Sequence, residues 1–200
     1  MANGNIKPTH WRGMHLRMKP PTQAETRRPR PLAMAVKWHP PDQPWIKVNT
    51  DGAYADATKK GGGGYILAAF SAPLEAQSAL EAELLAIIHG TNLAKEFGRP
   101  IWVEADAEQV VKLINSTSWG PAHTRRAMTR IGILMRQHTI RTTFIHREGN
   151  KAADYLAKLG LDRTIFCRMS AETAPRMLKA IARMDEMGIP NIRVHDEDRE

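Results

Sequence analysis

The chain contains 200 residues, of which 42% are hydrophobic and 25% are charged, and its formal net charge is +8. A chain of this size can bury one sizeable core, which leaves little room for two full domains and favours one domain with flanking tails. The positive charge favours a polyanionic partner such as nucleic acid, because Lys and Arg release counterions from phosphates.

Cysteine usage and hydropathy bear on the compartment. Cys167 is the only cysteine, so an intramolecular disulfide is excluded and a reducing compartment is expected. The sequence has no apolar run of membrane-spanning length, and its N-terminus lacks the apolar core of a secretory signal. We therefore expect an intracellular protein, in the nucleus or the cytoplasm, that has no membrane partner and acts as a monomer.

Residues 1–44 are rich in proline and basic side chains and show neither a helical nor a strand period. Such composition predicts a flexible leader. The run "RRPRP" within it could contact nucleic acid or direct nuclear import, although a cluster this small is more often a solvated linker.

The pattern changes at Trp45 and predicts a domain over residues 45–161. In "WIKVNTD", Ile46, Val48 and Thr50 alternate with polar residues, which predicts a strand with one buried face. A glycine-rich turn and the short apolar run "YILAAFS" follow, the latter typical of a second strand.

The rest of this domain alternates between helix and strand. Residues 78–98 predict the clearest helix, which begins with a capping box of Ser78 and Glu81 and ends at Gly98. Further on, the sequence predicts a strand in "PIWVEAD", helices in "AEQVVKLINS" and "AHTRRAMTRIGILMRQH", a strand in "TIRTTFIH" and a helix in "NKAADYLAKLG". This order predicts an α/β fold with a mixed sheet and flanking helices.

Residues 162–200 predict a C-terminal extension and tail. An amphipathic helix over about 171–187, with Met177, Leu178, Ile181 and Met184 on one stripe, is expected to dock on the domain through that stripe.

Four acidic residues lie at comparable places in the predicted topology. Asp51 ends the first strand, Asp106 ends "IWVEAD", Glu83 lies one turn into the clearest helix and Asp154 lies in the first turns of the short last helix. Strand ends and helix starts meet at one edge of an α/β sheet, so the four could converge there.

Each acid also has a structural interpretation. Asp106 with Gln109 could be a capping box, Glu83 could be a solvated helix residue, Asp154 could favour a helix N-terminus, and Asp51 with the next glycine could form a turn. A converged cluster, however, would need cations, because two carboxylates about 4 Å apart repel by roughly 4 kcal/mol at an effective dielectric near 20. Oxygen ligands without His or Cys favour Mg²⁺ or Mn²⁺, and a pair of such ions suits phosphoryl transfer.

The motifs "VNTDGA", "ALEAELLAI", "VEADAEQVV" and "HREGNKAADYLAK" resemble, in order and separation, those of type I ribonuclease H domains. The likeness is greatest to the reverse-transcriptase-like, retroelement-derived branch of plants and covers about residues 45–160, while "PRMLKAIARMDEMGIPNIR" resembles the tails of that branch. It implies a five-stranded mixed sheet with helices on both faces, and two-metal endonucleolytic hydrolysis of the RNA strand of an RNA–DNA hybrid.

The resemblance also assigns roles. Asp51, Glu83, Asp106 and Asp154 would be the catalytic quartet and hold two Mg²⁺ or Mn²⁺ ions, with Asp51 bridging them. Arg147, or His146 beside it, would take over the role of a loop histidine in bacterial members. The alternatives are a surface charge for Arg147 and an ordinary strand-end position for His146.

Further residues are candidates for contact with nucleic acid. The backbone around Gly52 and Ala53 could approach the 2′-hydroxyls of the hybrid, because glycine permits close approach. Arg125, Arg126 and Arg130 form a basic helix face that could contact the DNA backbone, or could be only solvated.

One departure from the family pattern leads to a rival hypothesis. "GGGGY" runs almost directly into "ILAAFS", so the hairpin of the second and third strands is expected to be shortened, with much of one strand lost. Such a loss could leave a catalytically impaired, retroelement-derived nucleic-acid-binding domain. A resolvase or integrase core with the same kind of fold is a third possibility.

Overall fold

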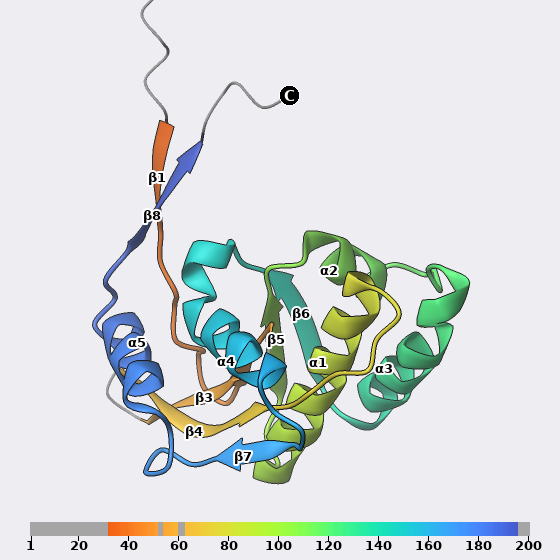
Figure 1. Ribbon diagram of the computed structural model, residues 1–200, viewed down its shortest axis with the longest axis horizontal. Helices are drawn as coiled ribbons and strands as arrows, with labels where there is room; N and C mark the ends of the chain where they lie inside the picture. Colours follow the sequence, from red (N-terminus) through yellow and green to blue (C-terminus); the bar gives the residue numbers. More distant parts are fainter. Residues whose placement is uncertain (1–31, 52–53, 60–62, 196–200) are drawn as a thin grey trace, which may run out of the picture. The chain divides into compact units, whose positions relative to one another are not determined.

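The computed structural model describes residues 32–51, 54–59 and 63–195, and one compact unit spans Ala33–Arg193. Its main sheet has six strands in the order β6-β5-β2-β3-β4-β7 (Figure 1). The strands are β2 (Ile46–Thr50), β3 (Tyr54–Lys59), β4 (Gly63–Ser71), β5 (Ile101–Ala105), β6 (Ile140–Phe144) and β7 (Cys167–Met169). Strands β2, β5 and β6 run parallel, and β3, β4 and β7 are added by antiparallel pairing.

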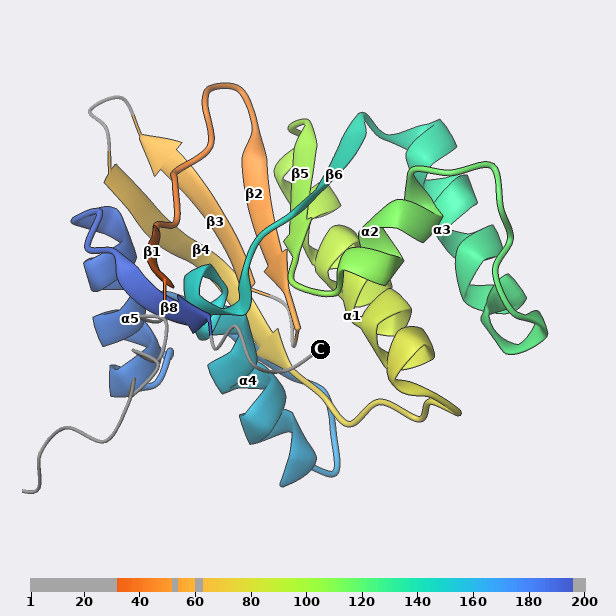
Figure 2. The same ribbon diagram turned by 90° about the horizontal axis from the view of Figure 1, so that it is seen from above.

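Helices cover both faces of this sheet (Figure 2). On one face, α1 (Ala79–Ala94), α2 (Glu108–Ile114) and α3 (Arg125–Gln137) enclose the larger core, in which Ile46 and Val48 are fully buried. On the other, α4 (Lys151–Leu161) and α5 (Arg176–Glu186) pack on β4 and β7 around Leu156 and Leu178. The predicted mixed α/β fold with helices on both faces is therefore confirmed.

The hairpin differs from its prediction. Strand β3 pairs with β2 from Tyr54 to Ala57 and with β4 along its whole length, so the expected loss of much of one strand is wrong. The sequence "YADATK" carries no apolar period, which is why it resembles a turn; its pairing with neighbours on both sides makes it a strand. All five expected strands are present, and β7 is an addition from the C-terminal extension.

The prediction of a flexible leader is wrong for residues 33–44. Strand β1 (Leu32–Val36) forms a separate two-stranded sheet with β8 (Asn191–His195), and Val36 and Trp38 are buried. Residues 1–31, where the "RRPRP" run lies, are outside the described residues. These contacts were not predicted because the segment is rich in proline and its few buried side chains do not follow a helical or strand period.

Two burial predictions also need correction. Strand β2 is buried on both faces, since Lys47 and Asn49 are as inaccessible as the apolar residues between them. On α5, Leu178 is buried and Ile181 packs against the core, but Met177 and Met184 are exposed, so the docking stripe is narrower than expected. In contrast, Ser78 does cap α1, because its side chain accepts a hydrogen bond from the Glu81 N–H at 3.1 Å.

Candidate active site

Three of the four predicted acids meet at one end of the sheet. Asp51 follows β2 and Asp106 follows β5, and these parallel strands are in register up to Thr50 and Ala105, so the two aspartates emerge side by side. Glu83 reaches them from the first turns of α1, which packs on both strands. One carboxylate oxygen of each residue lies within 4.8 Å of the others. We call Asp51, Glu83 and Asp106 the acidic cluster.

The cluster is electrostatically strained. Burial, followed by the charges of Asp51 and Asp106, raises the pKa of Glu83 to about 8. The pKa of Asp51 is also raised, first by burial and then by the charges of Asp106 and Asp154. Glu83 Oε2 is buried and has no hydrogen-bond partner among the described residues. Burial and mutual repulsion in the cluster thus outweigh the attraction of the nearby Arg147 charge for Asp51 and Glu83, and a bound cation would relieve this imbalance.

Asp154 lies beside the cluster but is differently compensated. It is close enough for its charge to raise the pKa of both Asp51 and Asp106. Its own carboxylate accepts hydrogen bonds from Arg147 and from Lys158, the latter at 2.6 Å. Partial burial raises the pKa of Asp154, but the hydrogen bonds and charges of Lys158 and Arg147 outweigh burial and leave that pKa below its usual value. Asp154 is thus already neutralised by two cationic side chains.

Asp106 is not a helix cap. The N-cap of α2 is Ala107, with no side-chain cap, and the Asp106 carboxylate instead accepts a hydrogen bond from Asn150 Nδ2 at 2.9 Å. Burial raises the pKa of Asp106, while this hydrogen bond opposes the rise because it favours the ionised form. Asp106 therefore points to the cluster rather than to the helix that follows it.

A buried polar network supports this carboxylate, and sequence reasoning missed it. Asn150 Nδ2 also donates to the Thr50 carbonyl at 2.9 Å, and Asn150 Oδ1 accepts from Asn49 Nδ2 at 3.1 Å. Asn49 in turn donates to Glu104 and accepts from the indole of Trp38. Asn is depleted in strands. The asparagine in "IKVNT" was therefore the available signal for a polar site on that face of β2.

The predicted loop residues lie next to the cluster with different partners. Arg147 is 68% exposed in its side chain, yet its guanidinium donates to Asp154, so it is more than a solvated charge. His146 packs edge-on against Phe144, and its Nδ1 lies 2.7 Å from Arg193 Nη1. Of the two, only Arg147 is bonded to a member of the predicted quartet in the described part of the chain.

The residues predicted to contact nucleic acid lie on α3 and directly after Asp51. Arg125, Arg126 and Arg130 are exposed on α3. His123, just before that helix, lies 2.9 Å from Ser78 at the start of α1, the helix that carries Glu83. The beginning of α3 is thus near the end of α1 that faces the site. Gly52 and Ala53 lie outside the described residues.

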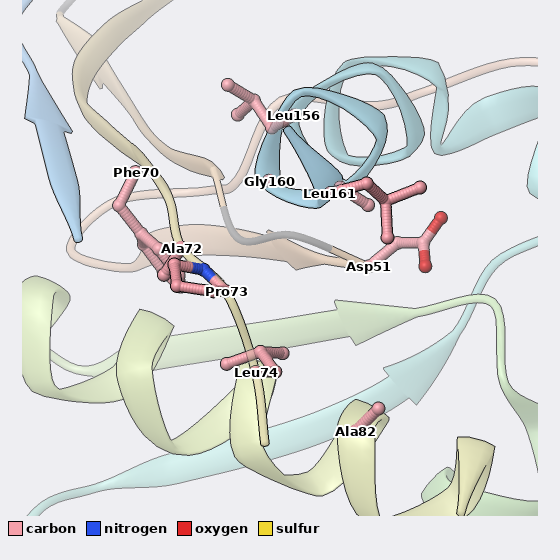
Figure 3. A pocket seen from close by; sticks show the side chains of 10 residues that line it. Asp51, Phe70, Ala72, Pro73, Leu74, Ala82, Leu156, Gly160 and Leu161 are labelled. Atoms are coloured by element: carbon pink, nitrogen blue, oxygen red, sulfur yellow. The ribbon is translucent and has the colours of Figure 1, made fainter. Parts of the chain in front are cut away.

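A cavity of about 350 Å³ adjoins the cluster. Among the described residues that line it, Asp51 alone is charged, and Figure 3 shows the other walls coming from β4 and the loop after it, from α1 and from the end of α4. These walls include Phe70, Leu74, Leu156 and Leu161. The acidic cluster is therefore bordered by an apolar hollow on one side and by the Arg147–Asp154–Lys158 group on another.

None of the described helices is both long and apolar enough to cross a membrane. Among known proteins, the chain is similar to one from Arabidopsis thaliana named "Putative ribonuclease H protein", with 27% identity over 164 residues. That match covers 76% of this chain and 26% of the relative, so the chain spans about a quarter of the relative's length.

Comparison with solved structures gives a related result. The chain is similar to RNase H1 from the halophilic archaeon Halobacterium salinarum, with a TM-score of 0.46 and 20% identity, covering 59% of this chain and 98% of that one. A family model described as "Reverse transcriptase-like" matches residues 49–160, the range that contains the acidic cluster, Arg147, Asn150 and Asp154. The match extends over more than half of the sequence, and the chain belongs to the reverse transcriptase-like family.

Proposed function

We propose that this protein is a divalent-metal-dependent endoribonuclease that hydrolyses the RNA strand of RNA–DNA hybrids. The observation that carries the proposal is the acidic cluster, in which carboxylate oxygens from three separate elements lie within 4.8 Å of one another. Family membership and the name of the Arabidopsis relative support a nucleic-acid hydrolase. The net charge of +8 suits a polyanionic substrate.

The residues of the acidic cluster fit Mg²⁺ or Mn²⁺, and we infer that two such ions bind. All donors of the cluster are carboxylate oxygens, the ligands that these hard cations prefer, and Glu83 Oε2 is buried without a partner among the described residues. Glu83 and Asp106 would hold one ion, Asp154 would help to hold the other, and Asp51 would contact both. When bound, such ions lower the pKa of an attacking water and stabilise the charge on the departing oxygen of a phosphodiester.

The chain's own side chains prepare this site. Asn150 fixes the Asp106 carboxylate and favours its ionised form, so that the residue is ready to act as a ligand. Arg147 and Lys158 keep Asp154 ionised and place positive charge where a scissile phosphate would approach. The exposed arginines of α3 offer a further surface for the DNA strand, and shape rather than base sequence would select the hybrid.

A cleavage assay tests the proposal directly. We expect the full chain to cut the RNA strand of an RNA–DNA hybrid when Mg²⁺ or Mn²⁺ is supplied, and Asp51→Asn to reduce the rate to background, because Asp51 is the shared member of the site. The products are resolved on denaturing gels with either strand labelled. Equal background cleavage by both proteins would refute catalysis, and cleavage of plain DNA duplexes would point to a resolvase or integrase activity.

The second candidate is a hybrid-binding protein that does not cleave. It is favoured by the pairing of Asp154 with Arg147 and Lys158, which neutralises the carboxylate that a second ion would use. Hybrid binding without turnover in either metal would support this candidate. The hairpin does not favour this non-cleaving candidate, since β3 and β4 are both formed.

The same pairing gives a prediction about ion binding. Lys158→Gln should increase the affinity for a second Mn²⁺ by about twofold, because it removes a cation that competes for Asp154 through an exposed i,i+4 pair worth about 0.3–0.5 kcal/mol. Titration with Mn²⁺, followed by electron paramagnetic resonance, measures the affinity of the first and of the second binding step. Lys112→Gln, which breaks the comparable i,i+4 pair with Glu108, is the control and should leave both steps unchanged. A weaker second step in Lys158→Gln would contradict the prediction.

A further inference from the structure

Two segments outside the residues matched to the family contact the framework of the site. Trp38 precedes the matched range 49–160 and Arg193 follows it, and both lie in the compact unit. We propose that Trp38 and Arg193 are positioning residues for the acidic cluster, Trp38 through two asparagines that orient Asp106, and Arg193 through the loop that carries Arg147. The inference rests on the proposed function in that the oriented carboxylate is taken to be a metal ligand.

The first link is the direction of the hydrogen bonds that begin at Trp38. The indole is buried, and its Nε1 donates to Asn49 Oδ1 at 2.9 Å. Because an indole N–H can only donate, Asn49 must turn its oxygen to Trp38 and its Nδ2 to Asn150 Oδ1, at 3.1 Å. Asn150 is thereby left with its Nδ2 facing Asp106 Oδ1 at 2.9 Å.

The order of these bonds matters because an amide has two unlike ends. A reversed Asn150 would set its carbonyl oxygen against the Asp106 carboxylate, which would repel it. Asn49 and Asn150 are both almost fully buried, so water does not readily supply a substitute for a lost bond. Donation from Asn49 to Glu104 and from Asn150 to the Thr50 carbonyl favours the same orientation. A fully satisfied buried network of this kind holds one geometry.

The second link runs from the C-terminal segment to the loop after β6. Arg193 Nη1 lies 2.7 Å from His146 Nδ1 and 3.7 Å from Glu148 Oε2. A guanidinium only donates, so His146 Nδ1 must be the acceptor. His146 and Glu148 flank Arg147, the residue bonded to Asp154. Arg193 therefore contacts the loop on both sides of that residue, through a hydrogen bond to His146 and an ion pair with Glu148.

The same loop is packed tightly from the N-terminal side. A Cβ added to Gly149 would lie 2.7 Å from Ile145 Cδ1 and 3.0 Å from Val36 Cγ1, so the backbone at Gly149 lies against the side chains of Ile145 and of Val36 in β1. The residue after Gly149 is Asn150. Both flanking segments thus converge on the stretch that joins Arg147 to Asn150, and the family range alone does not contain all the residues that hold it.

Trp38→Phe tests the first link, with Trp102→Phe as the matched control. Trp102 Nε1 donates to Thr143 Oγ1 at 2.6 Å, so the control loses an indole hydrogen bond of the same kind from a donor that is bonded to neither Asn49 nor Asn150. We expect Trp38→Phe to weaken Mn²⁺ binding about tenfold, as is usual for loss of a group that orients a ligand. It should also shift the side-chain amide NMR signals of Asn150. Trp102→Phe should destabilise the fold comparably and change neither readout.

Arg193→Gln tests the second link, with Arg183→Gln as its control because Arg183 pairs with Glu186 on the same exposed helix, away from the loop. Faster amide hydrogen exchange over residues 146–150 in Arg193→Gln alone is the expected result. Unchanged Asn150 signals in Trp38→Phe, or equal changes in Trp102→Phe, would overturn the inference. The NMR and exchange readouts need no ion, so a wild-type protein that binds no metal would refute the proposed function while these readouts still decide the positioning roles.

Discussion

Glu83→Gln is expected to abolish cleavage while making the metal-free protein more stable at pH 8. Loss of a group that only orients a metal ligand typically costs about 10–100-fold, so loss of a ligand itself should lower the rate at least about a hundredfold. The stability gain follows from linkage, because burial and the charges of Asp51 and Asp106 raise the pKa of Glu83 from 4.5 to about 8 in the folded chain.

The sign follows from which state binds the proton. Between pH 4.5 and about 8 the folded chain keeps Glu83 protonated while the unfolded chain has ionised it, so folding is favoured fully below pH 4.5 and this contribution is lost as the pH rises toward 8. We expect the unfolding free energy of the metal-free protein to fall by about 1–3 kcal/mol over that window. Glutamine mimics the neutral acid and should remove most of this fall, which corresponds to a melting temperature about 3–6 °C higher at pH 8.

Thermal unfolding with and without Mg²⁺ at pH 5, 6.5 and 8 measures both effects. Divalent ions should stabilise the wild-type protein more at higher pH, because they replace the proton on the cluster. Glu81→Gln is the control on the same helix, since Glu81 accepts a backbone hydrogen bond from Gln77 near the helix start and lies outside the cluster. A metal-free Glu83→Gln protein that is less stable than wild type at pH 8 would show that the cluster is not strained.

The convergence of Asp51 and Asp106 was predictable because it follows from topology. The carboxyl ends of neighbouring parallel strands meet at one edge, and each aspartate follows directly on such a strand. Glu83 joins them because its helix begins with a recognisable cap at Ser78, which fixes where its first turns fall. The pairing of Asp154 with Arg147, which distinguishes it from the acidic cluster, was not predictable. The fold of the loop after β6 brings Arg147 to this carboxylate.

The face of β2 that carries Lys47 and Asn49 shows why other parts of the fold and of the site were not predicted. Period-two alternation assigns Lys47 and Asn49 to solvent, but alternation reports only that the two faces differ, not what covers the second one. That face is closed by Trp38 from the N-terminal segment and Asn150 from the start of α4, distant in sequence from β2. The hairpin strand β3 was missed for a related reason, because its support comes from pairing with β2 and β4 rather than from an apolar period of its own.

Lys47→Met is expected to give the largest loss of stability of the substitutions proposed for this chain. Lys47 and Glu104 form a buried ion pair with an N–O distance of 3.1 Å and side chains 1% and 8% exposed. The ammonium also donates to the His39 carbonyl at 2.6 Å and lies 3.7 Å from the centre of the Trp102 ring. Removing one partner of such a pair leaves an uncompensated buried charge, so the unfolding free energy should fall by about 3–5 kcal/mol.

Denaturant unfolding of matched variants separates this cause from loss of packing. The double variant Lys47→Met with Glu104→Leu removes both charges at similar volume and should recover most of the loss, because the cost lies in the unpaired Glu104 rather than in the absent attraction. Arg168→Met breaks the exposed pair with Glu96 and should change stability by less than about 1 kcal/mol. If the double variant is as unstable as Lys47→Met, the network around Asn49 requires Glu104 as a hydrogen-bond acceptor. In that case the same carboxylate that balances Lys47 also helps to orient the amides that lead to Asp106.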